Sequence, residues 1–200
     1  MMKKLLPLLM PLFVPGDALA NYLINGNFES FSVSPGEYET FTNLQVPGWQ
    51  STVNEIEIWG NQYRGIPSYE GIRFVTLPPS TGLYQDIMLF DTSVISWSFA
   101  HRPRAGTDVL NFKIIDLQNN STVVDESFSN QLPRWTLYSG TFVGKSSEFR
   151  VSFDSVATIS GNNGNNLIGN YIDDVRVGYV PSPGSLAILL VAGLFVRKRR

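Results

Sequence analysis

The first residues whose types and spacing could do chemistry are Glu57, Trp59 and Tyr63. Glu57 and Trp59 are two positions apart, so on a strand their side chains share one face, and Tyr63 lies in the loop that follows. Aromatic faces stack on the apolar side of a pyranose ring, while flanking polar groups bind its hydroxyls. These three residues are therefore candidates for a ligand-binding rim.

A second candidate group surrounds the single histidine. His101, Arg102 and Arg104 lie together where an apolar stretch ends and a turn begins, and Asp108 follows shortly after. Guanidinium groups are planar donor forks that suit hydroxyl or carboxylate oxygens. We therefore include these three residues among the ligand-binding candidates. A structural role is an equal alternative, in which Asp108 pairs with an arginine and fixes the turn.

Catalytic groups are harder to assemble from this sequence. His101 has no serine in a nucleophile-elbow motif to activate, and the chain has no cysteine. Glu55 and Glu57 would stand about 7 Å apart on one strand face, as a glycosidase pair could, but alternating glutamates are more often a solvated face. We therefore do not expect an enzyme, and keep a weak glycosidase as an alternative.

The elements that would position these residues are strands. Apolar residues recur mainly with period two, and the body of the chain contains no convincing amphipathic helix. Short strands separated by Gly, Asn and Pro clusters predict an all-β fold, an antiparallel sandwich or jelly roll. The strands are expected at residues 55–59, 72–77, 82–88, 94–99, 109–116, 121–128, 135–142, 148–153 and 171–179.

Composition and charge fit one domain and argue against nucleic acid as a partner. The chain has 200 residues, of which 12% are aromatic and 16% charged, as in a turn-rich β domain. Basic residues concentrate at the two ends, which leaves the stretch between them acidic. Phosphate binding needs a basic stripe, so we expect no nucleic-acid partner.

The N-terminal end has the three-part layout of a secretory signal peptide. Two lysines precede an apolar run that is interrupted by prolines, which oppose a buried helix. Ala18 and Ala20 then stand at the positions that a signal peptidase reads. We expect residues 1–20 to be removed during export.

The C-terminal end also has the features of a sorting signal rather than of the folded domain. Residues 180–185 are Val-Pro-Ser-Pro-Gly-Ser, an apolar stretch follows, and the last four residues are basic. Basic residues directly after an apolar stretch act as a stop-transfer signal. This order resembles the PEP-CTERM sorting signal. The residues that carry the resemblance are Val180, Pro181, Pro183, Gly184, Arg197, Lys198, Arg199 and Arg200.

The PEP-CTERM resemblance implies a destination for the protein. It implies processing by an exosortase-type enzyme, a transient stay in the inner membrane through residues 180–200, and delivery to the envelope, surface or extracellular matrix of a Gram-negative bacterium. A plain C-terminal membrane anchor is the alternative, although the apolar stretch is shorter than a stable span requires.

Short motifs between the two ends point to a fold family. Residues 25–29 read Asn-Gly-Asn-Phe-Glu, residues 46–49 Val-Pro-Gly-Trp, residues 83–87 Leu-Tyr-Gln-Asp-Ile and residues 171–175 Tyr-Ile-Asp-Asp-Val. With these motifs, residues 21–179 resemble the galactose-binding-like β-sandwich of carbohydrate-binding modules. The resemblance implies that the first and last strands lie side by side. It also implies carbohydrate as the partner, in the form of extracellular polysaccharide or a cell-surface glycan.

The same resemblance implies a structural calcium ion. In such folds the segment that holds Asn27 and Glu29, together with an aspartate of the closing strand, often binds the ion. Asp173 and Asp174 point to opposite faces of a strand, so at most one of them can join Glu29, and we assign Asp173 to this role. Calcium prefers carboxylate and carbonyl oxygens, and a chain without disulfides gains stability from such an ion. The alternative is that both aspartates merely cap or line a strand edge.

Three functions stay open at this point. The first is a carbohydrate-binding module, the second a matrix or adhesion protein without a small-molecule ligand, and the third a weak glycosidase.

Overall fold

Alternating apolar residues form the long strands of the second half of the chain. In β7 (Thr107–Asp116), Leu110, Phe112 and Ile114 are buried, whereas Lys113 between them is partly exposed. This burial pattern is the period-two pattern of a strand with one face on a core. The computed structural model describes residues 21–89, 94–104, 106–131, 133–159 and 169–179.

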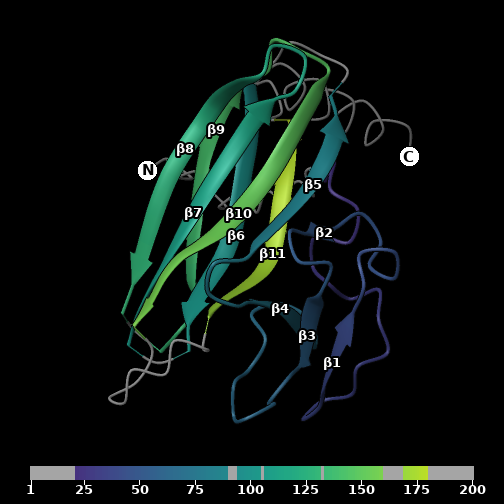
Figure 1. Ribbon diagram of the computed structural model, residues 1–200, viewed down its shortest axis with the longest axis vertical. Helices are drawn as coiled ribbons and strands as arrows, with labels where there is room; N and C mark the ends of the chain where they lie inside the picture. Colours follow the sequence, from purple (N-terminus) through teal and green to yellow (C-terminus); the bar gives the residue numbers. More distant parts are fainter. Residues whose placement is uncertain (1–20, 90–93, 105, 132, 160–168, 180–200) are drawn as a thin grey trace, which may run out of the picture.

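The described residues form eleven strands and no helix, which confirms the all-β prediction (Figure 1). Two antiparallel sheets face each other. Sheet A has the order β1-β3-β4-β11-β6-β9 and sheet B the order β2-β5-β10-β7-β8. The strands are β1 (Tyr38–Phe41), β2 (Gln50–Ser51), β3 (Ile56–Gly60), β4 (Arg73–Leu77), β5 (Gly82–Met88), β6 (Val94–Pro103), β7, β8 (Ser121–Asn130), β9 (Thr136–Val143), β10 (Glu148–Ile159) and β11 (Asn170–Tyr179).

A core of aromatic and aliphatic side chains fills the space between the sheets. Phe99 from sheet A packs against Phe112 and Phe153 from sheet B, with ring centroids 5.1 and 5.0 Å apart. Trp97 is 3% exposed and belongs to the same core, as its position in an alternating strand predicts. Burial of such rings is the main source of stability in a sandwich without disulfides.

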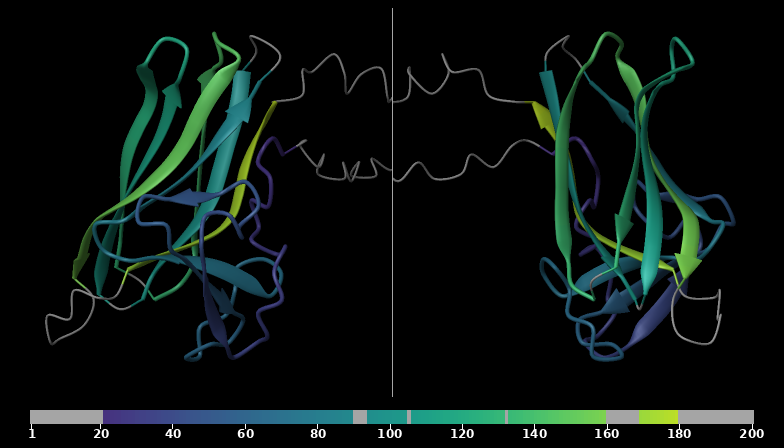
Figure 2. Two further views of the ribbon diagram at one scale, coloured as in Figure 1. Left: turned by 45° about the vertical axis from the view of Figure 1, so that its right-hand side comes forward. Right: turned by 90° about the vertical axis from the view of Figure 1, so that its left-hand side faces the viewer.

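The first and last described residues lie side by side, as the fold resemblance implied. The backbone N–H of Tyr22 donates to the carbonyl oxygen of Val177 at 2.8 Å, and the rings of Tyr22 and Tyr179 meet edge to face at 5.0 Å. Both views of Figure 2 show the start of the described chain beside β11. The opening segment is not itself a strand but pairs with the closing one.

Two features of sheet A depart from the sequence expectation. β6 continues to Pro103 rather than ending near Phe99, because residues 100–103 pair with residues 170–173 of β11. The register of that pairing then shifts between Asp173 and Arg176, where Asp174 adopts a positive φ of 49°. Such a bulge interrupts the alternation of side chains.

The predicted export and sorting segments, residues 1–20 and 180–200, lie outside the described residues. Within the described ranges, no helix has the length and apolar character that a membrane crossing requires.

Candidate functional site

The outer face of sheet A, which points away from sheet B, carries a second aromatic cluster. Trp59 and Phe74 are register partners on β3 and β4, and their neighbours Ile58 and Val75 point the other way into the core. We call the following set the Trp59 cluster: the buried residues Trp59, Ile66, Phe74 and Tyr171, and the partly buried Tyr63 and Trp135 packed against them.

The rings of the Trp59 cluster contact one another closely. The Trp59 ring lies 4.5 Å from that of Tyr63 in an edge-on arrangement and 5.1 Å from that of Tyr171. The Trp59 indole N–H donates to the Glu57 carboxylate, which confirms that the two side chains share one face. Trp59 is only 4% exposed, so its ring is not the open stacking platform that the sequence suggested. Tyr63 and Trp135 form the accessible rim instead.

Trp135 also differs from its expected position. As the first residue of the expected strand 135–142 it was predicted to be a core residue, but it is partly buried on the outer face, where its ring meets Phe74 edge to face at 5.5 Å. Its indole N–H donates to the carbonyl oxygen of Pro67 at 2.8 Å. It precedes β9 and therefore escapes the strand alternation that would have turned it inward.

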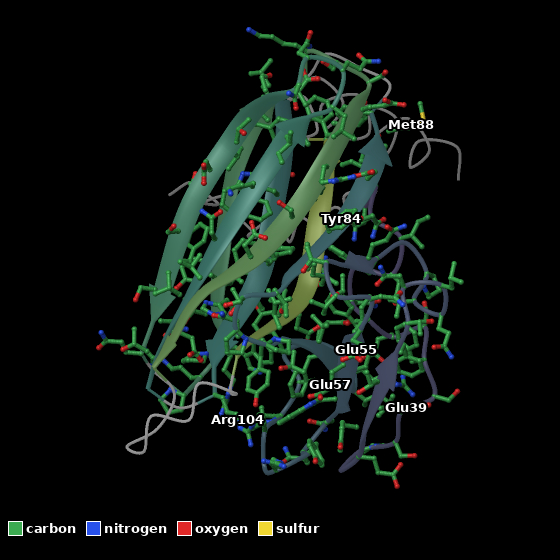
Figure 3. All side chains as sticks on the ribbon, viewed as in Figure 1. Glu39, Glu55, Glu57, Tyr84, Met88 and Arg104 are labelled. Carbon is green, nitrogen blue, oxygen red and sulfur yellow. The ribbon has the colours of Figure 1, made fainter. Side chains whose placement is uncertain are left out.

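Three arginines surround this cluster. The guanidinium of Arg104 lies 5.3 Å and that of Arg64 5.9 Å from the centre of the Trp59 ring, within cation–π range. Arg102 is the register partner of Tyr171 on the neighbouring strand and shares its face. The structure thus brings together five of the six ligand-binding candidates: Glu57, Trp59, Tyr63, Arg102 and Arg104. Figure 3 shows Glu57 and Arg104 at the end of the molecule where β3 and β4 lie.

His101, the sixth candidate, lies on the opposite face, and its assignment to the ligand surface is corrected. It is 0% exposed, and its Nε2 is 2.7 Å from the Asn170 side-chain oxygen. The Asn170 amide nitrogen donates to the carbonyl oxygen of Val109 at 3.3 Å, which can only accept, so the Asn170 side-chain oxygen accepts and His101 Nε2 carries the proton. Burial lowers the pKa of His101 to about 4. The physical reason is that β6 extends past His101, and alternation then separates it from Arg102.

Asp108 has the structural role that the alternative interpretation gave it, in a different form. Its buried carboxylate accepts the backbone N–H of Arg104 at 3.1 Å and so holds the turn between β6 and β7. The guanidinium of Arg104 is left to contact Trp59.

The carboxylate expected to bind calcium at Glu29 is occupied by protein donors. Its Oε1 accepts the backbone N–H groups of Ile72 and Arg73, both at 2.7 Å, and its Oε2 pairs with the Arg73 guanidinium at 2.8 Å. Arg73 also donates to the carbonyl oxygen of Val33 at 3.1 Å. The third expected ligand, Asn27, turns its side-chain oxygen toward the Glu29 N–H at 3.4 Å. Arg73 therefore supplies the positive charge that calcium was expected to supply.

Asp173 holds the same loop from the other end of the chain. Its Oδ2 accepts the N–H groups of Tyr69 and Glu70 at 2.8 and 3.0 Å, and its Oδ1 accepts the N–H of Asp174 at 2.7 Å. Burial raises the pKa of Asp173 to about 8, and these three hydrogen bonds act in the opposite direction. Asp174 pairs with Arg176 at 2.7 Å.

The residues expected to bind calcium therefore do not fit that ion. Each of their carboxylates already has N–H donors, and within the described residues no group of three or more His, Cys, Asp or Glu side chains is placed to hold a metal. Glu29 and Asp173 instead fasten residues 69–73, the loop that leads into β4 beside the Trp59 cluster.

Chelation of divalent cations is expected to leave the thermal midpoint of this chain unchanged. The reason is that Arg73 and backbone N–H groups, rather than a metal, neutralise the acidic side chains at the loop. Differential scanning fluorimetry with EDTA and with added calcium measures the effect. A midpoint that falls with EDTA and recovers with calcium would restore the calcium interpretation.

A shallow groove continues the outer face of sheet A away from the Trp59 cluster. It has a volume of about 340 Å³, and Ser96, Ser98, Ser139 and Thr141 are among the residues that line it. On β6, Ser96 and Ser98 share the face of Arg102, because even-numbered positions of this strand alternate regularly against β9. Hydroxyl groups and the arginines therefore follow one line along the sheet.

The outer face of sheet B offers a smaller aromatic site. Arg150 lies over the Tyr84 ring at 4.1 Å, but its guanidinium is also paired with Asp86 at 2.7 Å. Its charge is thus already neutralised by the protein.

Comparison with known proteins shows the fold. Neither a family model nor a curated protein matches the sequence. The solved structure of TmCBM61 in complex with β-1,4-galactotriose matches with a TM-score of 0.50 and 15% identity, over 80% of this chain and 99% of that one. The CBM22-2 xylan-binding domain of Paenibacillus barcinonensis Xyn10C matches with a TM-score of 0.51 and 15% identity, over 72% and 98%.

A larger protein contains the same fold as one part. The arabinose-bound MgGH51 α-L-arabinofuranosidase matches with a TM-score of 0.52 and 14% identity, over 80% of this chain but only 26% of the enzyme. The structural neighbours of this chain include carbohydrate-binding modules, and the chain has their antiparallel β-sandwich fold.

Proposed function

We propose that this chain is a non-catalytic module that binds carbohydrate, either an extracellular polysaccharide or a cell-surface glycan, on the outer face of sheet A. The observation that carries the proposal is the Trp59 cluster with its arginines. Partly buried Tyr63 and Trp135 offer ring surface, and Arg102 and Arg104 stand beside them. Aromatic surface flanked by hydrogen-bond donors is what sugar recognition requires.

The fold comparison supports this proposal. One neighbour was solved with a bound galactotriose and another is a xylan-binding domain, so the sandwich is a fold that carries carbohydrate binding in other proteins. The line of hydroxyl groups and arginines along β6 also suits an extended ligand, because Ser98 and Arg102 are about 13 Å apart at the rise of a strand.

Replacing Tyr63 by alanine is expected to weaken polysaccharide binding roughly fivefold, the size of one aromatic contact. Affinity gel electrophoresis of the full chain in gels that contain galactan, xylan or polygalacturonate measures the effect. Tyr84→Ala is the matched control, because Tyr84 is also partly buried and is also covered by an arginine, but lies on sheet B.

The outcomes separate the candidate functions. Loss of binding in Tyr84→Ala alone would move the site to sheet B. Release of oligosaccharides from the gel polymer would favour a weak glycosidase, and binding to envelope proteins without any glycan would favour an adhesion protein.

We also propose that the chain is exported and sorted to the cell surface. The signal-peptide layout of residues 1–20 and the PEP-CTERM-like order of residues 180–200 support this. Both segments join the sandwich at one place, since Tyr22 packs against Tyr179. Mass spectrometry of the mature protein tests the proposal: a chain that begins at Asn21 and lacks Arg200 is expected, and a secreted form that keeps both ends would refute it.

A further inference from the structure

The arginines of this chain differ in whether a carboxylate neutralises them. Three arginines pair with a carboxylate at 2.7 or 2.8 Å: Arg73 with Glu29, Arg150 with Asp86 and Arg176 with Asp174. Within the part of the chain that the structure describes, the exposed Arg134 makes no such salt bridge, and neither do Arg64, Arg102 and Arg104. These three gather on the outer face of sheet A, at the Trp59 cluster. Glu57 lies there too, but its carboxylate accepts the Trp59 N–H, and the group keeps an excess of positive charge.

The hydroxyl of Tyr171 lies among these charges without a hydrogen-bond partner. Tyr171 is 0% exposed, and its hydroxyl oxygen is a buried polar atom with no hydrogen-bond partner among the described residues. Burial raises the pKa of Tyr171, and the positive charges of Arg104, Arg102 and Arg64 act against that rise. The hydroxyl therefore stays protonated at neutral pH and is free to donate.

Arg102 contributes a second unsatisfied donor. Its Nε is buried without a hydrogen-bond partner among the described residues, and burial lowers the pKa of the group. Leaving buried donors without hydrogen bonds costs free energy. Two such donors on neighbouring strands therefore call for an acceptor that the described residues do not provide.

The chemistry of these donors selects the acceptor. A guanidinium has five N–H donors and no acceptor, and the Tyr171 hydroxyl adds one more donor. A sugar hydroxyl would bring a donor of its own, whereas a carboxylate brings only acceptors and fits the planar fork of an arginine in a bidentate manner.

We infer that the Trp59 cluster selects an acidic saccharide, and that the carboxylate of a uronic acid unit binds among Arg64, Arg102 and Arg104 beside the Tyr171 hydroxyl. This inference rests on the proposed function and names the ligand class of the same site. Arg150 on sheet B already pairs with Asp86, so its guanidinium is not available to the carboxylate of a ligand.

Polygalacturonate and its carboxyl-reduced form test the inference, because the two polymers differ only in the acid group. In isothermal titration calorimetry with the full chain, the reduced polymer is expected to bind at least roughly tenfold more weakly, as loss of a charge-assisted hydrogen bond predicts. The double variant Arg102→Ala/Arg104→Ala is expected to lose the preference, and Arg150→Ala is expected to keep it.

Tyr171→Phe keeps the test decisive if the arginine variant does not fold. Its hydroxyl has no hydrogen-bond partner in the described part of the chain, so the variant is expected to keep or raise the thermal midpoint while binding to polygalacturonate weakens several-fold. A merely structural hydroxyl would leave binding unchanged.

The outcomes separate this inference from the proposed function. Equal binding of both polymers, or equal binding of dextran sulfate, would overturn the acidic-saccharide inference and leave carbohydrate binding intact. Binding of no polymer would overturn the proposed function and the inference with it.

Discussion

Replacing Glu29 by alanine is expected to lower the free energy of unfolding by about 3 kcal/mol, the usual cost of breaking a largely buried ion pair. The change removes the acceptor of two backbone N–H groups, those of Ile72 and Arg73, and of the Arg73 guanidinium. The Arg73 side chain is only 14% exposed, so water cannot fully replace the lost carboxylate. Gly71 packs against that carboxylate so closely that there is no room for a Cβ, and removal of the carboxylate therefore leaves a gap beside the loop.

Urea denaturation followed by tryptophan fluorescence measures this effect. Glu39→Ala is the matched control, because Glu39 is an exposed glutamate on β1 and its loss should change stability by less than about 0.5 kcal/mol. Equal stability of the two variants would show that Glu29 does not hold the loop. A double variant with Arg73→Met should cost less than the sum of its parts, because the two side chains are directly paired.

Lowering the pH from 6.5 to 4 is expected to reduce the contribution of His101 to the free energy of unfolding by about 3 kcal/mol. The pKa of His101 is lowered to about 4 in the folded chain, so in this range only the unfolded chain binds the proton. The contribution of His101 is complete above pH 6.5 and is lost as the pH falls toward 4. Asp173 acts in the opposite sense, because its pKa is raised to about 8 and protonation of the folded chain stabilises it as the pH falls.

The variant His101→Gln separates the effect of His101 titration on the free energy of unfolding from the effect of Asp173 titration. Glutamine can still donate to the Asn170 side-chain oxygen but does not titrate, so its stability should fall less between pH 6.5 and 4 than that of the parent chain. Because the sequence has a single histidine, its imidazole resonance in an NMR titration is unambiguous. A midpoint near 6.5 would contradict the buried, neutral histidine.

Period-two patterning predicted most of the fold. The expected strands at residues 72–77, 82–88, 109–116 and 121–128 all occur within one or two residues of their observed ends. β1 and β2 were not predicted, because Tyr38–Phe41 is mostly exposed and Gln50–Ser51 is too short to show any pattern. Their pairing with β3 and β5 is a property of the assembled sheets.

Prediction of the site was limited by contacts between distant strands. Spacing alone put Glu57 beside Trp59, but the role of Tyr171 depends on β11 lying between β4 and β6, which local sequence does not encode. Alternation would also have separated His101 from Arg102 if the length of β6 had been known. The bulge after Asp173 was equally invisible, since an aspartate pair in a strand carries no sign of a positive φ.

The course of β11 has a mechanical consequence. The strand itself can be followed in Figure 1. Tyr171 stands near its start, inside the Trp59 cluster, and Tyr179 ends it beside Tyr22. At the rise of a strand, these two tyrosines are about 26 Å apart. A tether attached beyond Tyr179 would therefore hold the module at the end where Tyr22 and Tyr179 meet. The opposite end, which carries the arginines of the Trp59 cluster, would then face away from the tether. A long polymer could pass there without touching the surface that carries the tether.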